Sequence, residues 1–195
     1  MARVQFDREQ VIQDCTQLFW QQGFSGASMQ KVVQATGLKP GSLYLAFGSK
    51  EGLYQAALEH YARQSQATLS QALENAPSVG EGICQQLLRM IEAAEKADYC
   101  SCFLVKSQLE LAASGGDLHR RVCAYITEIE DLYVEYLQRD YPQDQARQYA
   151  TSLMMHVFGI RVYGYLERDR DRLLAAVKSG LPWLPWDACE QEALQ

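Results

Sequence analysis

Apolar residues recur three to four positions apart along nearly the whole chain, with polar residues between them. No stretch shows the sustained alternation of apolar and polar residues that is typical of a β-strand. The pattern therefore predicts an all-α protein. Glycine, proline and short polar segments divide it into about nine helices, expected at residues 7–22, 28–36, 40–47, 49–74, 80–97, 102–113, 117–139, 143–167 and 170–179.

The second and third of these helices are short and are joined by a tight turn. Ser28 is a good N-cap for the second, Gly37 supplies the conformation that the turn needs, and Pro40 is tolerated at the start of the third. Val33 and Leu43 are spaced to fill a small shared core. This is the plan of a helix-turn-helix, whose second helix fits the DNA major groove. An ordinary αα-hairpin has the same geometry and remains an alternative.

The helix expected at 143–167 is apolar nearly all round. Such a helix must be covered on both sides, and Gly159 and Gly164 allow close approach. We expect a homodimer seam through about residues 143–179, with a central helix in a monomeric core as the alternative.

Composition is that of a soluble globular protein, with 48% hydrophobic and 22% charged residues in 195. No apolar run reaches the length of a signal peptide or a membrane span, so we expect a cytoplasmic protein without a membrane partner. The six cysteines resemble neither a disulfide framework nor a zinc module, and we expect no metal and no cofactor.

The net charge of −6 would by itself argue against a nucleic-acid partner. Its distribution is uneven, however, because residues 1–55 hold five Lys/Arg against four Asp/Glu, while the remaining 140 residues carry a net charge of −7. Charge therefore permits a DNA-binding N-terminal part on an acidic body.

Four segments make the prediction specific: Gly23-Phe24, Ala35-Thr36-Gly37-Leu38, Gly41-Ser42-Leu43-Tyr44 and the run from Phe47 to Leu53. In order and spacing they resemble the N-terminal signature of the TetR family of transcriptional regulators. The resemblance implies a helix-turn-helix DNA-binding domain at 1–50 and a helical ligand-sensing and dimerisation domain at 51–195. It also implies a non-enzymatic repressor that leaves its palindromic operator when the second domain binds a small ligand or is modified at cysteine.

The same resemblance assigns DNA contacts to residues of the second, third and fourth helices. These candidates are Ser28, Gln30, Lys39, Pro40, Ser42, Tyr44, Leu45 and Lys50. Each also has a plainer interpretation: Ser28 as an N-cap only, Lys50 as a solvated side chain, and Leu45 as a surface apolar residue.

Aromatic, aliphatic and polar residues of the later helices are candidates for contacts with an inducer, or are plain core. They are Leu87, Met90, Phe103, Tyr125, Tyr133, His156 and Arg161. Cys100 and Cys102, in a segment similar to one found in a TetR subgroup, are candidate sensors of electrophiles or oxidants, and inert buried thiols are the alternative.

Two other function classes remain as alternatives, a thiol-dependent enzyme and a helical adaptor that does not bind DNA. The sequence contains no nucleophile elbow, metal-binding helix motif or phosphate loop. Both alternatives predict that the protein has no salt-dependent affinity for DNA.

Overall fold

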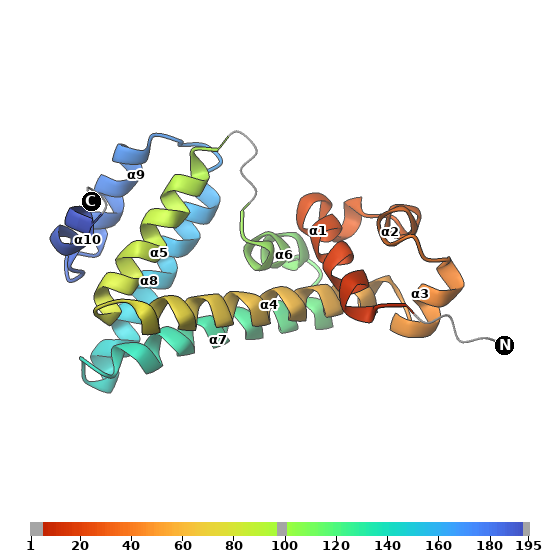
Figure 1. The fold of residues 1–195 in the computed structure, drawn as a ribbon, viewed down its shortest axis with the longest axis horizontal. Helices are drawn as coiled ribbons and strands as arrows, with labels where there is room; N and C mark the ends of the chain where they lie inside the picture. Colours follow the sequence, from red (N-terminus) through yellow and green to blue (C-terminus); the bar gives the residue numbers. More distant parts are fainter. Residues whose placement is uncertain (1–5, 97–100, 193–195) are drawn as a thin grey trace. The chain divides into compact units, whose positions relative to one another are not determined.

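The computed structural model describes residues 6–96 and 101–192, and within these ranges the chain forms ten helices and no strand (Figure 1). The helices are α1 (Arg8–Gly26), α2 (Met29–Thr36), α3 (Pro40–Phe47), α4 (Lys50–Asn75), α5 (Val79–Ala94), α6 (Phe103–Leu111), α7 (Asp117–Leu137), α8 (Gln143–Tyr163), α9 (Arg170–Gly180) and α10 (Trp186–Glu192). The predicted all-α class is confirmed, and α10 is the helix that the sequence pattern did not predict.

The end of α1 differs from the prediction. We expected the helix to stop at residue 22, but helical structure resumes after Gly23 and continues to Gly26. Gly23 itself breaks the geometry, with φ 74° and ψ 176°. The last turn is a separate short piece, because a glycine in this region ends regular helix.

The chain packs into two compact units, residues 1–64 with 102–126 and residues 65–101 with 127–195. Helices α4 and α7 therefore each contribute to both units. This division concerns packing, whereas the predicted boundary at residue 50 concerns the separation of DNA binding from sensing, which stays a prediction.

An aromatic cluster forms the centre of the first unit. Tyr54 of α4 and Phe19 of α1 are fully buried with edge-to-face rings 4.9 Å apart, and Phe24 and Phe103 pack on Tyr54 at 5.0 and 5.4 Å. These contacts tie α1, α4 and α6 into one core. Buried aromatic pairs in this arrangement add to the stability that burial alone provides.

In the second unit, α5 contacts α8, α9 and α10 (Figure 1). Leu87, Ile91, Leu153 and Leu181 fill the core between these helices. Gly180 ends α9 against His156 of α8, and a Cβ at this glycine would lie 1.9 Å from the imidazole Nε2. A larger residue at this position would therefore require the His156 ring to move.

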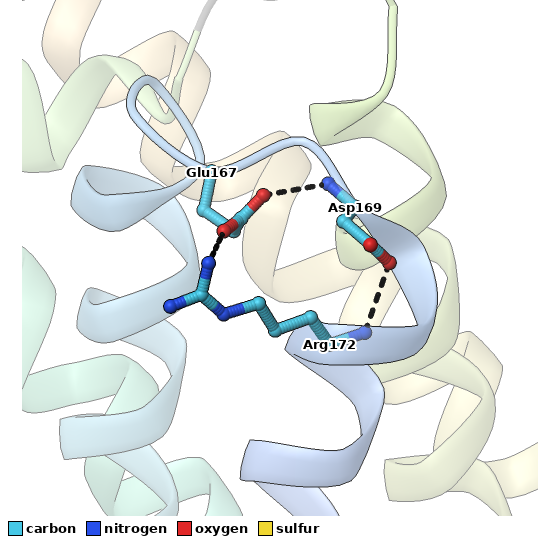
Figure 2. Close-up of polar contacts among 3 residues, drawn as sticks. All are labelled: Glu167, Asp169 and Arg172. Carbon is cyan, nitrogen blue, oxygen red and sulfur yellow. Dashed lines mark hydrogen bonds and ion pairs between the residues drawn. The ribbon is translucent and has the colours of Figure 1, made fainter.

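Three polar residues fix the link from α8 to α9 (Figure 2). Asp169 caps α9 by accepting a hydrogen bond from the Arg172 backbone N–H at 3.1 Å. The Glu167 carboxylate accepts one from the Asp169 backbone N–H at 3.0 Å and forms an ion pair with the Arg172 guanidinium at 2.5 Å. The N-terminus of α9 is thus held by a side-chain cap and a short ionic bridge.

In the described part of the chain, no helix is both long and apolar enough to cross a membrane.

Candidate nucleic-acid interface

Helices α2 and α3 form the predicted helix-turn-helix. Ser28 precedes α2 in an extended conformation, and its hydroxyl accepts a hydrogen bond from the Lys31 backbone N–H at 3.3 Å. Gly37 ends α2 in the left-handed region (φ 67°), and its N–H donates to the Val33 carbonyl at 2.9 Å. A left-handed residue at this point turns the chain sharply, and glycine adopts it without steric cost.

Helix α3 is anchored by its inner face and by its C-terminal end. Leu43 is fully buried and fixes the inner face of the helix. Gly48 ends α3 at φ 77°, and its N–H donates to the Tyr44 carbonyl at 2.8 Å. The next helix follows closely, because Ser49 accepts a hydrogen bond from the Gly52 N–H at 3.2 Å, as an N-cap does.

At Gly52 the start of α4 lies close to the end of α3. A Cβ built there would lie 2.0 Å from the carbonyl oxygen of Phe47. Because no real Cβ contact is that short, only glycine fits without a backbone shift.

The predicted DNA-contact residues lie on or immediately before α2 and α3 and at the start of α4, all in the first unit. Exposed are Ser28, Gln30, Lys39, Pro40, Tyr44 and Leu45, while Ser42 and Lys50 are half-buried. Tyr44 and Leu45 stand out, since their exposed fractions of 47% and 90% are large for an aromatic and an aliphatic side chain. Whether these residues contact DNA remains a prediction.

Lys50 also makes a contact within the protein. Its ammonium nitrogen lies 4.4 Å from the centre of the Phe24 ring, a cation–π contact. A second cation–π contact joins Arg8 and Phe47, where the guanidinium lies 5.1 Å from the centre of the ring. Both cations are held by aromatic rings at the ends of α1 and α3, and the sequence analysis did not find either contact.

A carboxylate from α6 caps the short helical piece that follows Gly23. The Oε2 of Glu110 accepts a hydrogen bond from the Phe24 N–H at 2.9 Å, and its Oε1 accepts one from the Ser25 N–H at 2.8 Å. Burial raises the pKa of this carboxyl, but the hydrogen bonds from Ser25 and Phe24, helped by the charge of Lys50, outweigh burial and lower the pKa overall. Glu110 therefore acts as an ionised cap for a helix far away in the sequence.

A second contact from α6 reaches the same end of α1. The Lys106 ammonium donates to the Trp20 carbonyl oxygen at 2.5 Å. Lys106 and Glu110 together satisfy backbone groups on both sides of Gly23, an acceptor before it and donors after it. Sequence reasoning missed this pair because contacts over such separations leave no local pattern.

The predicted inducer contacts are divided between the two units. Phe103 and Tyr125 belong to the first, where Phe103 is part of the aromatic core. Leu87, Met90, Tyr133, His156 and Arg161 belong to the second. There, burial raises the pKa of Tyr133 and the nearby charge of Arg161 opposes the rise. His156 is half-buried, and its Nδ1 lies 2.8 Å from the Ser152 carbonyl oxygen.

The cysteines of the described residues are free thiols. Cys102 is half-buried and immediately precedes α6, whereas Cys100, the other predicted sensor, lies outside the described residues. Burial, with a smaller effect of Asp14, raises the pKa of Cys15 to about 12, and burial beside Cys189 also raises the pKa of Cys84. Thiols with raised pKa values are poor nucleophiles at neutral pH, so Cys15 and Cys84 suit a structural role.

Helix α8 has one buried apolar face and exposed apolar residues on another. One face is buried and includes Leu153, Met154 and Ile160. Large apolar residues on its other face and in the turn after it remain exposed, namely Met155, Val162, Tyr163, Tyr165 and Leu166. Gly159 is also exposed, and a Cβ there would meet nothing within 4 Å.

Comparison with known proteins places this geometry in a family context. A family profile described as "Bacterial regulatory proteins, tetR family" matches residues 13–57, which contain α2 and α3. The chain is 31% identical to the HTH-type transcriptional repressor BdcR of Escherichia coli K12 over 139 residues, 71% of this chain and 69% of BdcR. It is 30% identical to the HTH-type transcriptional repressor ComR of the same strain over 115 residues, 58% of this chain and 55% of ComR.

Among solved structures, a cysteine mutant of the TetR family transcriptional regulator CifR, complexed with 26-bp double-strand operator DNA, shares the fold with a TM-score of 0.75. The two sequences are 30% identical, and the match covers 93% of this chain and 98% of CifR. The reduced form of Escherichia coli NemR shares the fold with a TM-score of 0.71 at 19% identity, over 88% of this chain and 95% of that one.

Proposed function

Because this chain belongs to the tetR family of bacterial regulatory proteins, it is a DNA-binding transcriptional regulator, and we propose that it acts as a repressor that binds a palindromic operator as a homodimer. The observation that carries the proposal is the exposed outer face of α3, which projects Tyr44 and Leu45 from a helix anchored by buried Leu43. The proposed role is non-enzymatic, and a DNA partner supports a cytoplasmic location for the protein.

In this proposal Ser28, Gln30 and Lys50 contact phosphates, and α3 enters the major groove. Lys39, Pro40, Ser42, Tyr44 and Leu45 then lie at or near the bases. Support comes from the exposure of six of these eight residues, Ser42 and Lys50 being half-buried, and from their common origin in one small packed unit. The cation–π contact with Phe24 supports Lys50 further, because a side chain that is already ordered loses less entropy on binding a phosphate.

The homodimer forms through about residues 143–179. The exposed apolar residues of α8 support this, since Met155, Val162 and Tyr163 share a face with Gly159 at helical spacing. A patch of this kind on a soluble protein usually marks an interaction surface. Two copies are needed because one short helix recognises too few base pairs for a specific site.

The repressor leaves DNA when residues 51–195 bind a small molecule or when Cys100 or Cys102 is modified. Leu87, Met90, Phe103, Tyr125, Tyr133, His156 and Arg161 are the proposed inducer contacts. Helix α4, which contributes to both units, carries the signal by changing how the two α3 helices of the dimer fit successive major grooves. For strong switching, the signal must favour the non-binding state by several kcal/mol.

The proposal is tested by binding of the full-length protein to DNA upstream of its own gene, at two salt concentrations, beside a Tyr44→Ala variant. We expect specific binding that weakens steeply with salt and is reduced in the variant. Failure to select any specific DNA sequence from a random pool would contradict the proposal.

A further inference from the structure

The outermost ridge of α3 consists of Gly41 and Leu45. Leu43 is fully buried, and in a helix with 3.6 residues per turn the positions two before and two after it point away from the core. Leu45 is 90% exposed, the highest value among the large apolar side chains that the structure describes. Gly41, one turn earlier, is also exposed.

Nothing in the fold requires glycine at position 41. Its φ is not positive, and a Cβ there would meet nothing within 4 Å. Gly52 is the opposite case, because its Cβ would collide with the Phe47 carbonyl oxygen. Glycine disfavours helix relative to alanine, and its use at an unconstrained exposed position is typical where another molecule's surface comes close.

The composition of α3 limits what it recognises. Pro40–Phe47 contains no Arg, Lys, Asn or Gln, the residues that form bidentate or charged hydrogen bonds to guanine and adenine in the major groove. Thymine is distinguished there by its C5-methyl group, which takes an apolar partner. A leucine on the central ridge of the helix supplies such a partner.

We propose that Leu45 recognises the C5-methyl group of a thymine in each operator half-site, and that Gly41 leaves the space for that base edge to approach α3. Side chains of a helix lean toward its N-terminus, so the Leu45 side chain leans toward Gly41 without reaching it. The ridge therefore presents one exposed apolar side chain next to backbone that carries no side chain. This inference rests on the proposed DNA-binding function and specifies the base chemistry that it recognises.

The test uses an operator selected from random double-stranded DNA by the full-length protein. Each dT of one half-site is replaced in turn by dU, which keeps base pairing and removes only the methyl group, and affinity is measured by fluorescence anisotropy. We expect one replacement to weaken binding roughly fourfold, the value for loss of one buried methyl group. Replacement in both half-sites is expected to multiply the two losses.

Variants link the methyl effect to Leu45. In Leu45→Ala the dT-to-dU penalty should disappear, while in Leu109→Ala it should remain. Leu109 is the matched control because it is an exposed leucine (57%) on α6 of the same unit. Gly41→Ala should raise the Tm by roughly 1–4 °C and yet weaken operator binding, a combination that a purely structural glycine would not give.

The outcomes separate this inference from the function on which it rests. A specific operator whose affinity is insensitive to every dU, or whose dU penalty survives in Leu45→Ala, would overturn the thymine assignment and leave the repressor proposal standing. Failure to select any operator would overturn both.

Discussion

Tyr54 and Ser107 form a buried polar pair inside the aromatic core of the first unit. Their hydroxyl oxygens lie 2.6 Å apart, with Tyr54 fully buried and Ser107 1% exposed. Burial raises the pKa of Tyr54 to about 12 although the hydrogen bond with Ser107 opposes the rise, so the tyrosine is neutral at physiological pH. Each hydroxyl satisfies the other in a place that water does not reach.

Removing either hydroxyl should leave the other without this partner. We expect Tyr54→Phe and Ser107→Ala each to lower the free energy of unfolding by about 1–3 kcal/mol, measured by urea denaturation. The double variant should lose less than the sum, by on the order of 1 kcal/mol. Strictly additive losses would show that the hydrogen bond contributes nothing measurable.

Gly52 and Gly41 should respond to alanine in opposite directions. Gly52→Ala should lower the free energy of unfolding by about 1–3 kcal/mol, because its Cβ would overlap the Phe47 carbonyl oxygen and displace the start of α4. Gly41→Ala is the matched control and should not lose stability. Equal thermal unfolding curves for the two variants would contradict the tight α3–α4 junction.

At the scale of elements, the last turn of α1 depends on α6. The residues after Gly23 begin a short helical piece, and the Glu110 carboxylate supplies acceptors for its first N–H groups. The sequence pattern placed most helix boundaries within a few residues, since caps, glycines and prolines are local signals. It misplaced the end of α1 because the stabilising group lies 86 residues away.

Glu110→Gln should destabilise the protein by about 1–2 kcal/mol at pH 7, because an amide offers one acceptor oxygen in place of two and removes the charge. The native pKa of Glu110 is lowered from its ordinary 4.5. Its contribution is therefore fully present above about pH 4.5 and is lost as the pH falls through the lower native value. Urea denaturation of both proteins between pH 7 and pH 3 should show the difference shrinking with acid, and a constant difference would contradict the ionised cap.

For the whole molecule, the sequence predicted the helices of the helix-turn-helix better than the tertiary contacts that hold α1 against α6. Ser28, Gly37 and Pro40 have local roles that their residue types reveal, and α2 and α3 lie where the pattern put them. Lys106 and Glu110 were not assigned to α1, because only tertiary packing brings them there. A boundary drawn from the motif alone separates residues that the fold packs together.

Dimerisation should depend on the exposed face of α8. Met155→Glu and Val162→Glu place a charge in the proposed apolar seam, so we expect light scattering to give a mass near the 22.1 kDa of one chain. Operator affinity should fall by at least about tenfold through loss of bivalent binding. Leu109→Glu, on an exposed leucine outside α8, should remain dimeric. Retention of the dimer in both α8 variants would contradict this seam.

The interleaving of the two compact units limits how regulators of this design can be recombined. The chain passes between the units after residues 64, 101 and 126. Consider a chimera that joins only the first 50 residues of this chain to the body of another regulator. The other protein then supplies the positions of Lys106 and Glu110. The transplanted α1 would lack its cap unless the same two residues stand at those positions. Grafting residues 102–126 together with 1–64 moves the whole packed unit, and such a graft should preserve operator choice, although it also carries the proposed inducer contacts Phe103 and Tyr125.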